Sequence, residues 1–543
     1  MGVHVVWFKR DLRVEDHPAL CAAAEAAQGD GGRVLALWVY EDEVWHALES
    51  DARHLVFCNQ SLGDLERRLG HIGLALVRRR GRVPGVFDAL ANDLAGAGLG
   101  GIAALWSSEE TGQGLTFDRD KRVKRWARER GVAWNELAAT GVQRPIGSRD
   151  GWAKRWERRM IALPLGVPAC VRGAAARSVG ELDARAMGVR DESPEVDPGD
   201  PRRQRGGAGE GEALIESFLS ARGVNYQRDM SSPNAGWEGC SRLSPHLAWG
   251  TVSTRSVYHA VRAREAALRA MPAGERDPMW LRSLRSFHGR LRWRDHFMQK
   301  LEDEPSIEFR NMHRAYHGMR GEDERAWGEL ERERFEAWRL GRTGYPMVDA
   351  CMRCLRATGW MNFRMRAMVV SFASYHLWLH WKPTATHLAR VFIDYEPGIH
   401  FSQCQMQSGT TGINTVRIYS PAKQAADQDP RGVFIRRWVP ELAGLRDDEL
   451  AEPHGAEESD GLFGGLPGGL GSLGYPRPIV DHARAYRAAR DRVFAVRASP
   501  QAKRESTRVY LKHGSRKRGG RPRAGDWTGR EDRGGAHERN DRA

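Results

Sequence analysis

The sequence predicts an α/β domain with a parallel sheet, followed by a larger domain made almost entirely of helices. Short β-branched and aromatic runs, VHVVWF at 3–8 and RVLALWVY at 33–40, flank a helical pattern, PALCAAAEAA at 18–27. Strands that alternate with helices are typical of parallel α/β sheets. Beyond residue 212 strand patterns nearly vanish and helical patterns dominate, so we expect the second domain to be all-α.

Four regions follow from this pattern. Strand patterns continue through ALVRR and GIAALWSS, so the first domain spans 1–135. The polar stretch that follows is rich in Pro and Gly toward its end, which is typical of a connection, and we predict an interdomain linker over 136–211. The helical domain then spans 212–500. The Gly- and Arg-rich tail, 501–543, has almost no apolar residues to bury, and we expect it to be disordered.

The composition fits a large protein of a reducing compartment. A chain of 543 residues is well above the ~250–300 residues at which single cores stop growing, so more than one domain is expected. Seven cysteines, odd in number and scattered, do not form a disulfide framework. No run approaches the ~18 uncharged apolar residues of a membrane helix, and the start MGVHVVWFKRDLR indicates a strand rather than a signal peptide. We therefore expect a cytoplasmic protein without membrane association.

The charge balance favours an acidic polymer as partner. The net charge is +14 and the isoelectric point is near 9.7. Half of this excess lies in the tail, because residues 501–543 contain 13 Lys and Arg but only 6 Asp and Glu. A nonspecific nucleic-acid tether and a merely solvated arginine-rich tail both explain that excess.

The stretch DYEPGIHFSQCQMQSG, residues 394–409, gathers two carboxylates, a histidine and a thiol. We expect no metal site, because the pair Cys351 and Cys354 lacks a second pair of ligands at suitable spacing. A nucleophilic Cys404 lacks an evident oriented base. The sequence has no phosphate loop of the form GxxxxGK[ST], and no GxGxxG follows the first strand. The stretch is best interpreted as the wall of a cofactor pocket.

A serine-containing motif suits an anionic ligand. In GCSRLSPHLAWGTVS, residues 239–253, small hydroxyl residues precede a helix start. Ser241, Ser244 and nearby backbone N–H groups could therefore meet an anion at the positive end of that helix. A simple helix cap explains one of these serines.

An arginine pair in WMNFRMRAM, residues 360–368, indicates a buried charge. Arg364 and Arg366 are two residues apart and must point to different sides of a helix. A buried Arg366 would need a carboxylate, because an unpaired buried charge costs several kcal/mol. Either Asp394 or Glu396 can supply it.

Several long segments resemble the photolyase and cryptochrome flavoproteins. They lie in the family's order from residue 1 to about 490: WFKRDLRVEDHPAL (7–20), EAWRLGRTGYPMVDACMRCLRATGWMNFRMR (336–366), IDYEPG (393–398), RIYSPAKQAADQDPRGVFIRRWVPEL (417–442) and YPRPIVDH (475–482). The resemblance implies an N-terminal α/β domain that can hold an antenna chromophore, folate or deazaflavin, with Glu109 as a candidate contact. It also implies a helical domain that holds U-shaped FAD at the bottom of a cavity facing DNA.

The resemblance assigns cofactor contacts as well. The FAD-phosphate grip matches Tyr226, Cys240, Ser241, Arg242, Leu243 and Ser244, with Cys240 where a threonine is usual. The flavin and ribose contacts match Arg366, its ion-pair partner Asp394, the adjacent Tyr395 and Glu396, and His400 near flavin N5. Asparagine is frequent at this last position, and a histidine there can tune which redox and protonation state of the flavin persists.

On the DNA side the resemblance places Trp293 against the damaged base pair and Arg294 beside it. Further DNA-side positions are Arg290, Arg364 and Gln424. The lesion-binding positions depart from the family pattern. Arg290 replaces the glutamate of cyclobutane-dimer photolyases, Met406 replaces a second tryptophan, Ala367 replaces a methionine, and Asn362 and Phe363 replace the histidine pair of (6-4) photolyases.

The family's electron path of three tryptophans is also altered. Cys404 occupies the flavin-proximal position, Trp381 keeps the middle one, and no tryptophan stands clearly at the outer one. Other aromatic residues are then candidates for a different route: Trp338, Trp360, Tyr375 and Trp378.

The sequence thus predicts a two-domain FAD protein that acts as a monomer on UV-damaged DNA. Four residues are expected to be catalytic: Trp293, Arg294, His400 and Trp381. The favoured function is blue-light-driven repair of pyrimidine photoproducts by electron transfer from reduced FAD. The alternative is a cryptochrome-type photoreceptor or redox sensor, which the altered lesion and electron-path positions favour. A nonphotochemical flavin or DNA-binding protein is a third possibility.

Overall fold

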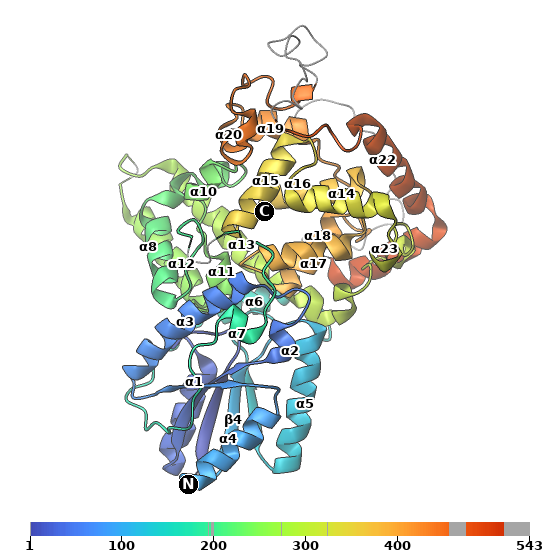
Figure 1. Cartoon of the computed structure of the whole chain (residues 1–543). Coiled ribbons are helices and arrows are strands. Elements are labelled where there is room, and N and C mark those ends of the chain that lie inside the picture. Colours follow the sequence, from blue (N-terminus) through green and yellow to red (C-terminus); the bar gives the residue numbers. More distant parts are fainter. Residues whose placement is uncertain are drawn as a thin grey trace.

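A computed structural model describes residues 2–514, apart from 194, 197–199, 273, 323 and 455–473. It shows an α/β domain followed by a helical domain, as the sequence predicts (Figure 1). Five parallel strands form one sheet in the order β3-β2-β1-β4-β5. Their bounds are β1 Val3–Phe8, β2 Arg33–Tyr40, β3 Leu76–Arg80, β4 Ile102–Ser108 and β5 Ala133–Leu137.

Helices cover both faces of this sheet because the side chains of its central strands are apolar on both sides. Val6 and Phe8 pack in a cluster with residues of α1 (Pro18–Asp30) and α3 (Ala52–Gly70). Val5 and Trp7 pack in a second cluster with residues of α4 (Gly85–Gly96) and α5 (Gly114–Arg130). The short α2 is Asp42–Trp45. The domain therefore has three layers, with the carboxyl ends of its strands directed toward the helical domain (Figure 1).

The helical domain is built around the long helix α13 and a core of buried side chains from α15 to α18. Its principal helices are α8 Ala208–Ser220, α9 Tyr226–Asp229, α10 Ala235–Gly239, α11 Ser244–Ala248, α12 Thr254–Ala270, α13 Pro278–Asp303, α14 Glu329–Leu340, α15 Pro346–Thr358, α16 Phe363–Ser371, α17 Trp381–Val391, α18 Pro397–Gln407, α19 Pro421–Gln428 and α20 Val433–Trp438. A π-helical turn, η5, spans Phe372–His376.

Gly359 ends α15 and brings it against the segment that follows α17. Its φ of +73° is the left-handed conformation that favours glycine at a helix end. Its carbonyl accepts a hydrogen bond from the N–H of Ile393 at 3.0 Å. A Cβ at this position would lie 2.5 Å from an Ile393 side-chain carbon, so the close approach requires glycine.

The stretch predicted as a linker, 136–211, contains regular structure. It holds α6 (Trp152–Ile161) and α7 (Ala184–Met187), and α8 already begins at Ala208. On α6 the buried side chains of Trp152, Trp156 and Met160 recur every four residues and pack into the helical domain. This connection therefore adds a helix to the second domain.

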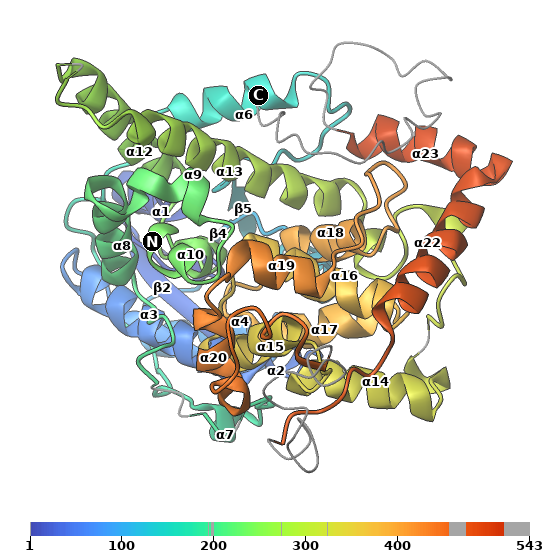
Figure 2. The same cartoon turned by 90° about the horizontal axis from the view of Figure 1, so that it is seen from above.

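The expectation of a disordered tail from residue 501 is wrong for its first part. Residues Pro500–His513 form helix α23, which follows α22 (His482–Ala498) along one side of the helical domain (Figure 2). The buried His513 bonds to Glu304, just past the end of α13, with Nε2 2.7 Å from Oε2. This tertiary contact stabilises a segment whose composition alone indicates disorder. The remainder of the predicted tail, 515–543, lies outside the described residues.

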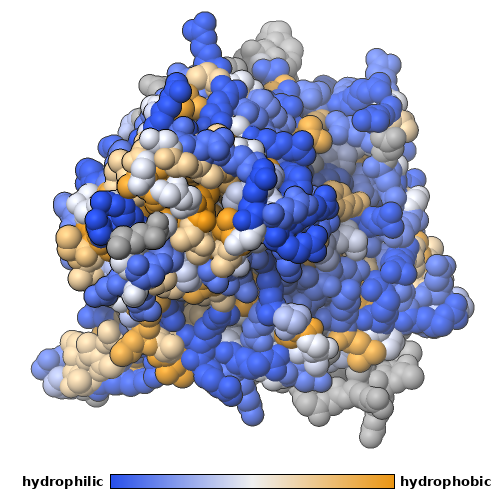
Figure 3. Space-filling view, turned by 90° about the horizontal axis from the view of Figure 1, so that it is seen from below, coloured by the Kyte–Doolittle hydropathy of each residue, from blue (hydrophilic) through white to orange (hydrophobic). Residues whose placement is uncertain are grey.

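The surface on the side of the α/β domain is mostly hydrophilic, with apolar side chains gathered in separate patches (Figure 3). This agrees with a mean hydropathy of −0.58. Within the described part of the chain, every helix is too short or too polar to cross a lipid bilayer.

Candidate functional site

The segment between α17 and α18 carries the predicted ion pair. Asp394 binds Arg366 through two bonds, Oδ1 to Nη1 at 2.9 Å and Oδ2 to Nη2 at 2.6 Å. The same guanidinium donates from Nε to the carbonyl of Met361 and covers the ring of Phe392. The Asp394 side chain is 2% exposed and that of Arg366 is 27% exposed. The buried carboxylate therefore fixes the guanidinium through two nitrogens, and part of the guanidinium remains accessible.

A second acidic residue of the segment, Glu396, lies beside Arg294 of α13. The Nη2 atom of Arg294 is 3.8 Å from Oε2 of Glu396 and donates to the carbonyl of Leu247 at 2.9 Å. Its Nη1 binds Asp295 at 2.7 Å. Burial raises the pKa of the Glu396 carboxyl. Arg294 is thus directed inward, because successive helical residues point about 100° apart, and its role beside Trp293 on the DNA side stays a prediction.

His400 lies on α18, one turn after Glu396. Its Nε2 is 2.8 Å from the carbonyl oxygen of Ala385, so Nε2 carries the proton and Nδ1 is the acceptor nitrogen. Burial lowers the pKa of His400 to about 4, which keeps the imidazole neutral near pH 7. Cys404 is one further turn along, with Sγ 3.8 Å from Nε2, and burial raises its pKa to about 12. This cysteine is thus a thiol, and the nucleophile interpretation finds no support.

The predicted phosphate grip is divided between accessible and buried side chains. Ser244, at the start of α11, is exposed, and Ser241 is partly exposed. The guanidinium of Arg242 is instead stacked between the rings of Trp237 and Trp360, 4.0 Å from each. Its side chain is therefore not available to a phosphate, contrary to its assignment as a cofactor contact.

The remaining members of this motif are mostly buried. Leu243 is 1% exposed and lies in an apolar cluster with Tyr226, whose ring packs against Phe218 and Phe287. Cys240 is partly exposed, and burial raises the pKa of its thiol to about 12. The accessible hydroxyls of the motif are thus those of the two serines. The assignment of Leu243 as a contact holds at most for its backbone.

The predicted DNA-side residues differ in exposure. Arg290 is exposed and its guanidinium lies 5.6 Å from the ring of Phe363, which is itself half exposed. Trp293 is partly exposed and stacks on Phe297 with ring centroids 5.6 Å apart. Gln424 is 7% exposed on α19, and its contact with DNA stays a prediction. The hydrophilic character of glutamine does not reveal on which face of α19 it lies.

Trp381 is fully buried, and its indole N–H donates to Oδ1 of Asn311 at 2.6 Å. Its ring lies 6.3 Å from that of Phe401, which is 5.5 Å from the ring of His400. The guanidinium groups of Arg320 and Arg492 lie 4.5 and 4.8 Å from the ring centre of the candidate Trp378, and two cations disfavour removal of an electron from its ring. Electron transfer through Trp381 stays a prediction.

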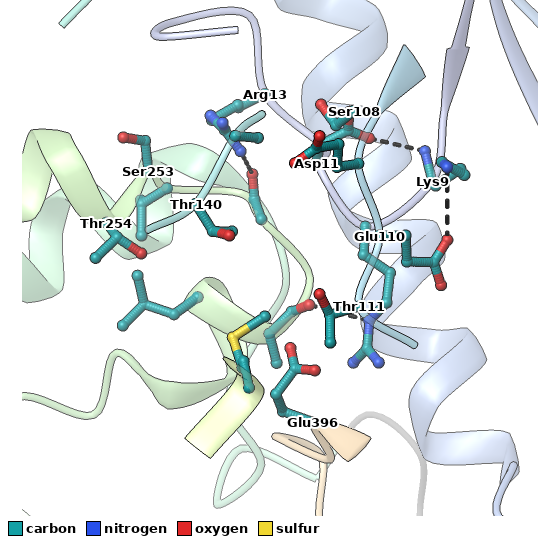
Figure 4. A pocket seen from close by; sticks show the side chains of 18 of the residues that line it. Lys9, Asp11, Arg13, Ser108, Glu110, Thr111, Thr140, Ser253, Thr254 and Glu396 are labelled. Carbon is teal, nitrogen blue, oxygen red and sulfur yellow. Dashed lines mark hydrogen bonds and ion pairs between the residues drawn. The ribbon is translucent and has the colours of Figure 1, made fainter. Parts of the chain in front are cut away.

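A small pocket lies between the two domains, at the carboxyl ends of β1 and β4 (Figure 4). Lys9, Glu109 and Glu110 line it from the α/β domain, and Ser253 and Glu396 line it from the helical domain. The expected antenna contact Glu109 is thus part of this pocket. Its volume of about 50 Å³ is far below the ~300–1,000 Å³ of typical ligand sites. A folate or deazaflavin does not fit it in this form.

The described ranges contain no group of three or more His, Cys, Asp or Glu side chains that could hold a metal ion. Cys351 and Cys354 are both buried, and burial raises the pKa of Cys354 to about 12. These two cysteines therefore belong to the core of the helical domain.

Sequence reasoning missed three residues of the α/β domain that contact the backbone around Asp394. They are Arg10, Arg53 and His54. Each is separated from its partner by more than 300 residues, and an arginine or histidine in a predicted first domain gives no signal for such a contact.

Comparison with known proteins gives consistent matches over both domains. Residues 4–146 match the family model described as DNA photolyase, and residues 287–495 match the FAD binding domain of DNA photolyase. The chain is 30% identical to a deoxyribodipyrimidine photo-lyase of Streptomyces griseus, over 89% of this chain and 98% of that protein. It is 29% identical to cryptochrome DASH of Gloeobacter violaceus, over 96% of this chain and 98% of that protein.

Solved structures share the fold at lower identity. A class III photolyase from Agrobacterium tumefaciens matches with a TM-score of 0.74 and 22% identity, covering 92% of this chain and 98% of the other. A cryptochrome from Synechocystis matches with a TM-score of 0.72 and 23% identity, covering 90% and 99%.

Proposed function

Because this chain belongs to the DNA photolyase and cryptochrome family, we propose that it is an FAD-dependent photolyase that repairs UV-induced pyrimidine photoproducts in blue light. The observation that carries the proposal is the partly exposed Arg366 of α16, which is paired with Asp394, together with the neutral His400 on α18. Arg366, Asp394 and His400 all lie within residues 287–495, which match the family model of the FAD binding domain of DNA photolyase.

The residues present fit a flavin dinucleotide. Ser241 and Ser244 offer accessible hydroxyl groups of the kind that bind a pyrophosphate. Arg366 offers a cationic edge whose direction is fixed by two bonds to Asp394. His400 offers an acceptor nitrogen in a buried position. Bound FAD, once reduced and excited by light, would supply the electron that splits the photoproduct.

The protein's own part is to bind and orient FAD and the damaged base and to exclude water from the site. Asp394 keeps Arg366 from rotating, and His400 keeps its proton at Nε2 because the Ala385 carbonyl accepts it there. Trp293 is partly exposed and Phe363 is half exposed, so both offer ring surfaces on which an unpaired base can stack. The reaction needs no side-chain nucleophile, in agreement with the protonated state of Cys404.

We further propose that the protein acts as a cytoplasmic monomer on UV-damaged DNA. The net charge of +14 supports an acidic polymer as partner. The proposed reaction does not require an antenna chromophore, and the interdomain pocket is too small for one in this structure.

A second candidate function is that of a light or redox sensor. Arg290 supports it, because an exposed arginine beside Phe363 stands at a lesion-contact position where the resemblance predicts a glutamate. The curated relatives include proteins named photo-lyase and proteins named cryptochrome.

DNA binding separates these two candidates. We expect the FAD-loaded protein to bind UV-irradiated oligonucleotides more tightly than unirradiated ones in the dark, and to lose this preference on illumination as lesions are consumed. Equal affinity for both DNAs in the dark would contradict the repair proposal. Deflavinated protein is the control for the contribution of FAD.

A further inference from the structure

The backbone around Asp394 is held from the side of the α/β domain. Carbonyl groups of residues 391, 392, 393 and 395 each accept a hydrogen bond from a side chain. Three of the four donors, Arg53, His54 and Arg10, come from the α/β domain. We call these three residues the carbonyl clamp.

Arg53 makes the most extensive contacts of the clamp. Its Nη1 donates to the carbonyl of Val391 at 3.0 Å and to the carbonyls of Leu355 and Arg356 at 3.4 and 3.2 Å. These oxygens belong to the last turns of α15 and α17. Asp51 and Ser193 fix the other guanidinium nitrogens at 3.0 and 2.9 Å. One buried side chain thus joins two helix ends next to the candidate site.

The other two members continue along the segment. His54 donates from Nε2 to the carbonyl of Phe392 at 2.9 Å, and its ring stacks on that of Tyr395. Arg10 donates from Nη2 to the carbonyl of Tyr395 at 2.5 Å and from Nε to that of Ala248 at 3.0 Å. The fourth donor, Trp249 of the helical domain, binds the carbonyl of Ile393 at 3.3 Å.

The acidic side chains of this segment have partners in the helical domain. Asp394 binds Arg366 of α16, and Glu396 lies beside Arg294 of α13. The segment is thus held at three of its carbonyls by the α/β domain and at its two carboxylates by the helical domain. We propose that Arg10, Arg53 and His54 are positioning residues of the FAD site, which set the direction of the Asp394 carboxylate by fixing its backbone. The α/β domain then contributes to the geometry of the flavin site, although that site lies in the helical domain.

This inference rests on the proposed FAD site and is tested by flavin binding rather than repair. Two substitutions of His54 separate loss of the hydrogen bond from loss of the side chain. His54→Gln keeps an N–H donor at similar reach, and His54→Leu removes it. We expect FAD dissociation constants near wild type for His54→Gln and raised roughly fivefold or more for His54→Leu. Arg53→Met, which loses several bonds, should raise the constant further. The visible circular dichroism of bound FAD should change in the same order.

A matched control is Arg203→Met. Arg203 is also buried and donates to a carbonyl near the end of α15, that of Ala357 at 2.9 Å, but it bonds to none of the carbonyls of residues 391–395. The Arg203→Met variant should leave the visible circular dichroism of bound FAD unchanged. Equal FAD affinity in His54→Leu and wild type, or equal weakening in His54→Gln and His54→Leu, would overturn the inference.

A double variant tests whether the clamp acts through Asp394. Asp394→Asn alone should weaken FAD binding, and adding His54→Leu should then cause little further loss. Full additivity of the two changes would contradict a shared action. Normal FAD affinity in Asp394→Asn would reject the proposed flavin site itself, whereas a failure confined to the His54 variants rejects only the clamp.

Discussion

At the scale of single residues, the pair of Arg366 and Asp394 is the feature on which the candidate site depends. Replacing Asp394 with alanine leaves a largely buried guanidinium without its carboxylate. We expect FAD binding to weaken by roughly 10- to 100-fold, measured by titrating deflavinated protein with FAD. Asp394→Asn, which keeps the shape without the charge, serves as a comparison. Unchanged flavin content in the alanine variant would show that the pair is not part of the site.

His400 allows a second prediction at this scale. Its neutral ring presents Nδ1 as an acceptor, which favours a protonated nitrogen on a neighbouring flavin. His400→Leu removes that acceptor, and we expect the reduced holoprotein to be reoxidised severalfold faster in air, followed by absorbance. His400→Asn retains a hydrogen-bonding side chain and should lie between the two. An identical rate in all three proteins would mean that His400 only fills space.

The need for a carboxylate beside a buried Arg366 could be predicted from the sequence, with Asp394 and Glu396 as the two candidates. The family resemblance selected Asp394, and the structure shows this pair. The inward direction of Arg294 could not be predicted. Neighbouring positions on a helix differ by about 100°, and a partner for Arg294 in a segment about 100 residues away leaves no local pattern.

At the scale of elements, α23 changes what a truncation would test. Residues 515–543 carry nine Lys and Arg against five Asp and Glu, a net charge of +4 that a deletion can remove without touching α23. We expect this deletion to weaken DNA binding at low salt and to make its salt dependence less steep, measured by fluorescence anisotropy. Equal affinity with and without these residues at low salt would exclude a contribution of the tail.

The longer deletion of 501–543 is expected to behave differently. It also removes His513 and Arg508, which bond to Glu304 and to the carbonyl of Met312. This variant should unfold at a lower temperature than the shorter one. Composition predicted disorder here because the segment is polar, while the contacts that order α23 lie about 200 residues away.

At the scale of the whole molecule, buried histidines should make stability fall in acid. Burial lowers the pKa values of His54, His246 and His400 to about 4, against about 6.5 in an unfolded chain. Between pH 6.5 and 4 the unfolded state binds more protons, so the free energy of unfolding decreases as pH falls through this window and is unaffected by these groups above it. Each histidine contributes at most roughly 3 kcal/mol.

Urea unfolding of the holoprotein at several pH values checks this prediction. His246→Asn, at a position away from the Asp394 segment, should reduce the slope of stability against pH by about one proton. A free energy of unfolding that stays constant from pH 7 to 5 would contradict it.

The two-domain architecture was predictable because strand and helix patterns differ and because the chain changes from one to the other near residue 135. The dependence of the Asp394 segment on the α/β domain was not. Arg53 and Val391 are 338 residues apart, and their contact follows only from how the two domains pack.

The most direct test of the proposed repair function is chemical. The purified holoprotein is reduced, mixed with oligonucleotides that carry a cyclobutane dimer or a (6-4) product, illuminated with blue light, and the restored bases are quantified by chromatography against a dark control. We predict light-dependent restoration of one of the two lesions, and its loss in Asp394→Ala in proportion to lost FAD. No restoration of either lesion by fully FAD-loaded protein that still binds DNA would contradict the repair function and favour the sensor.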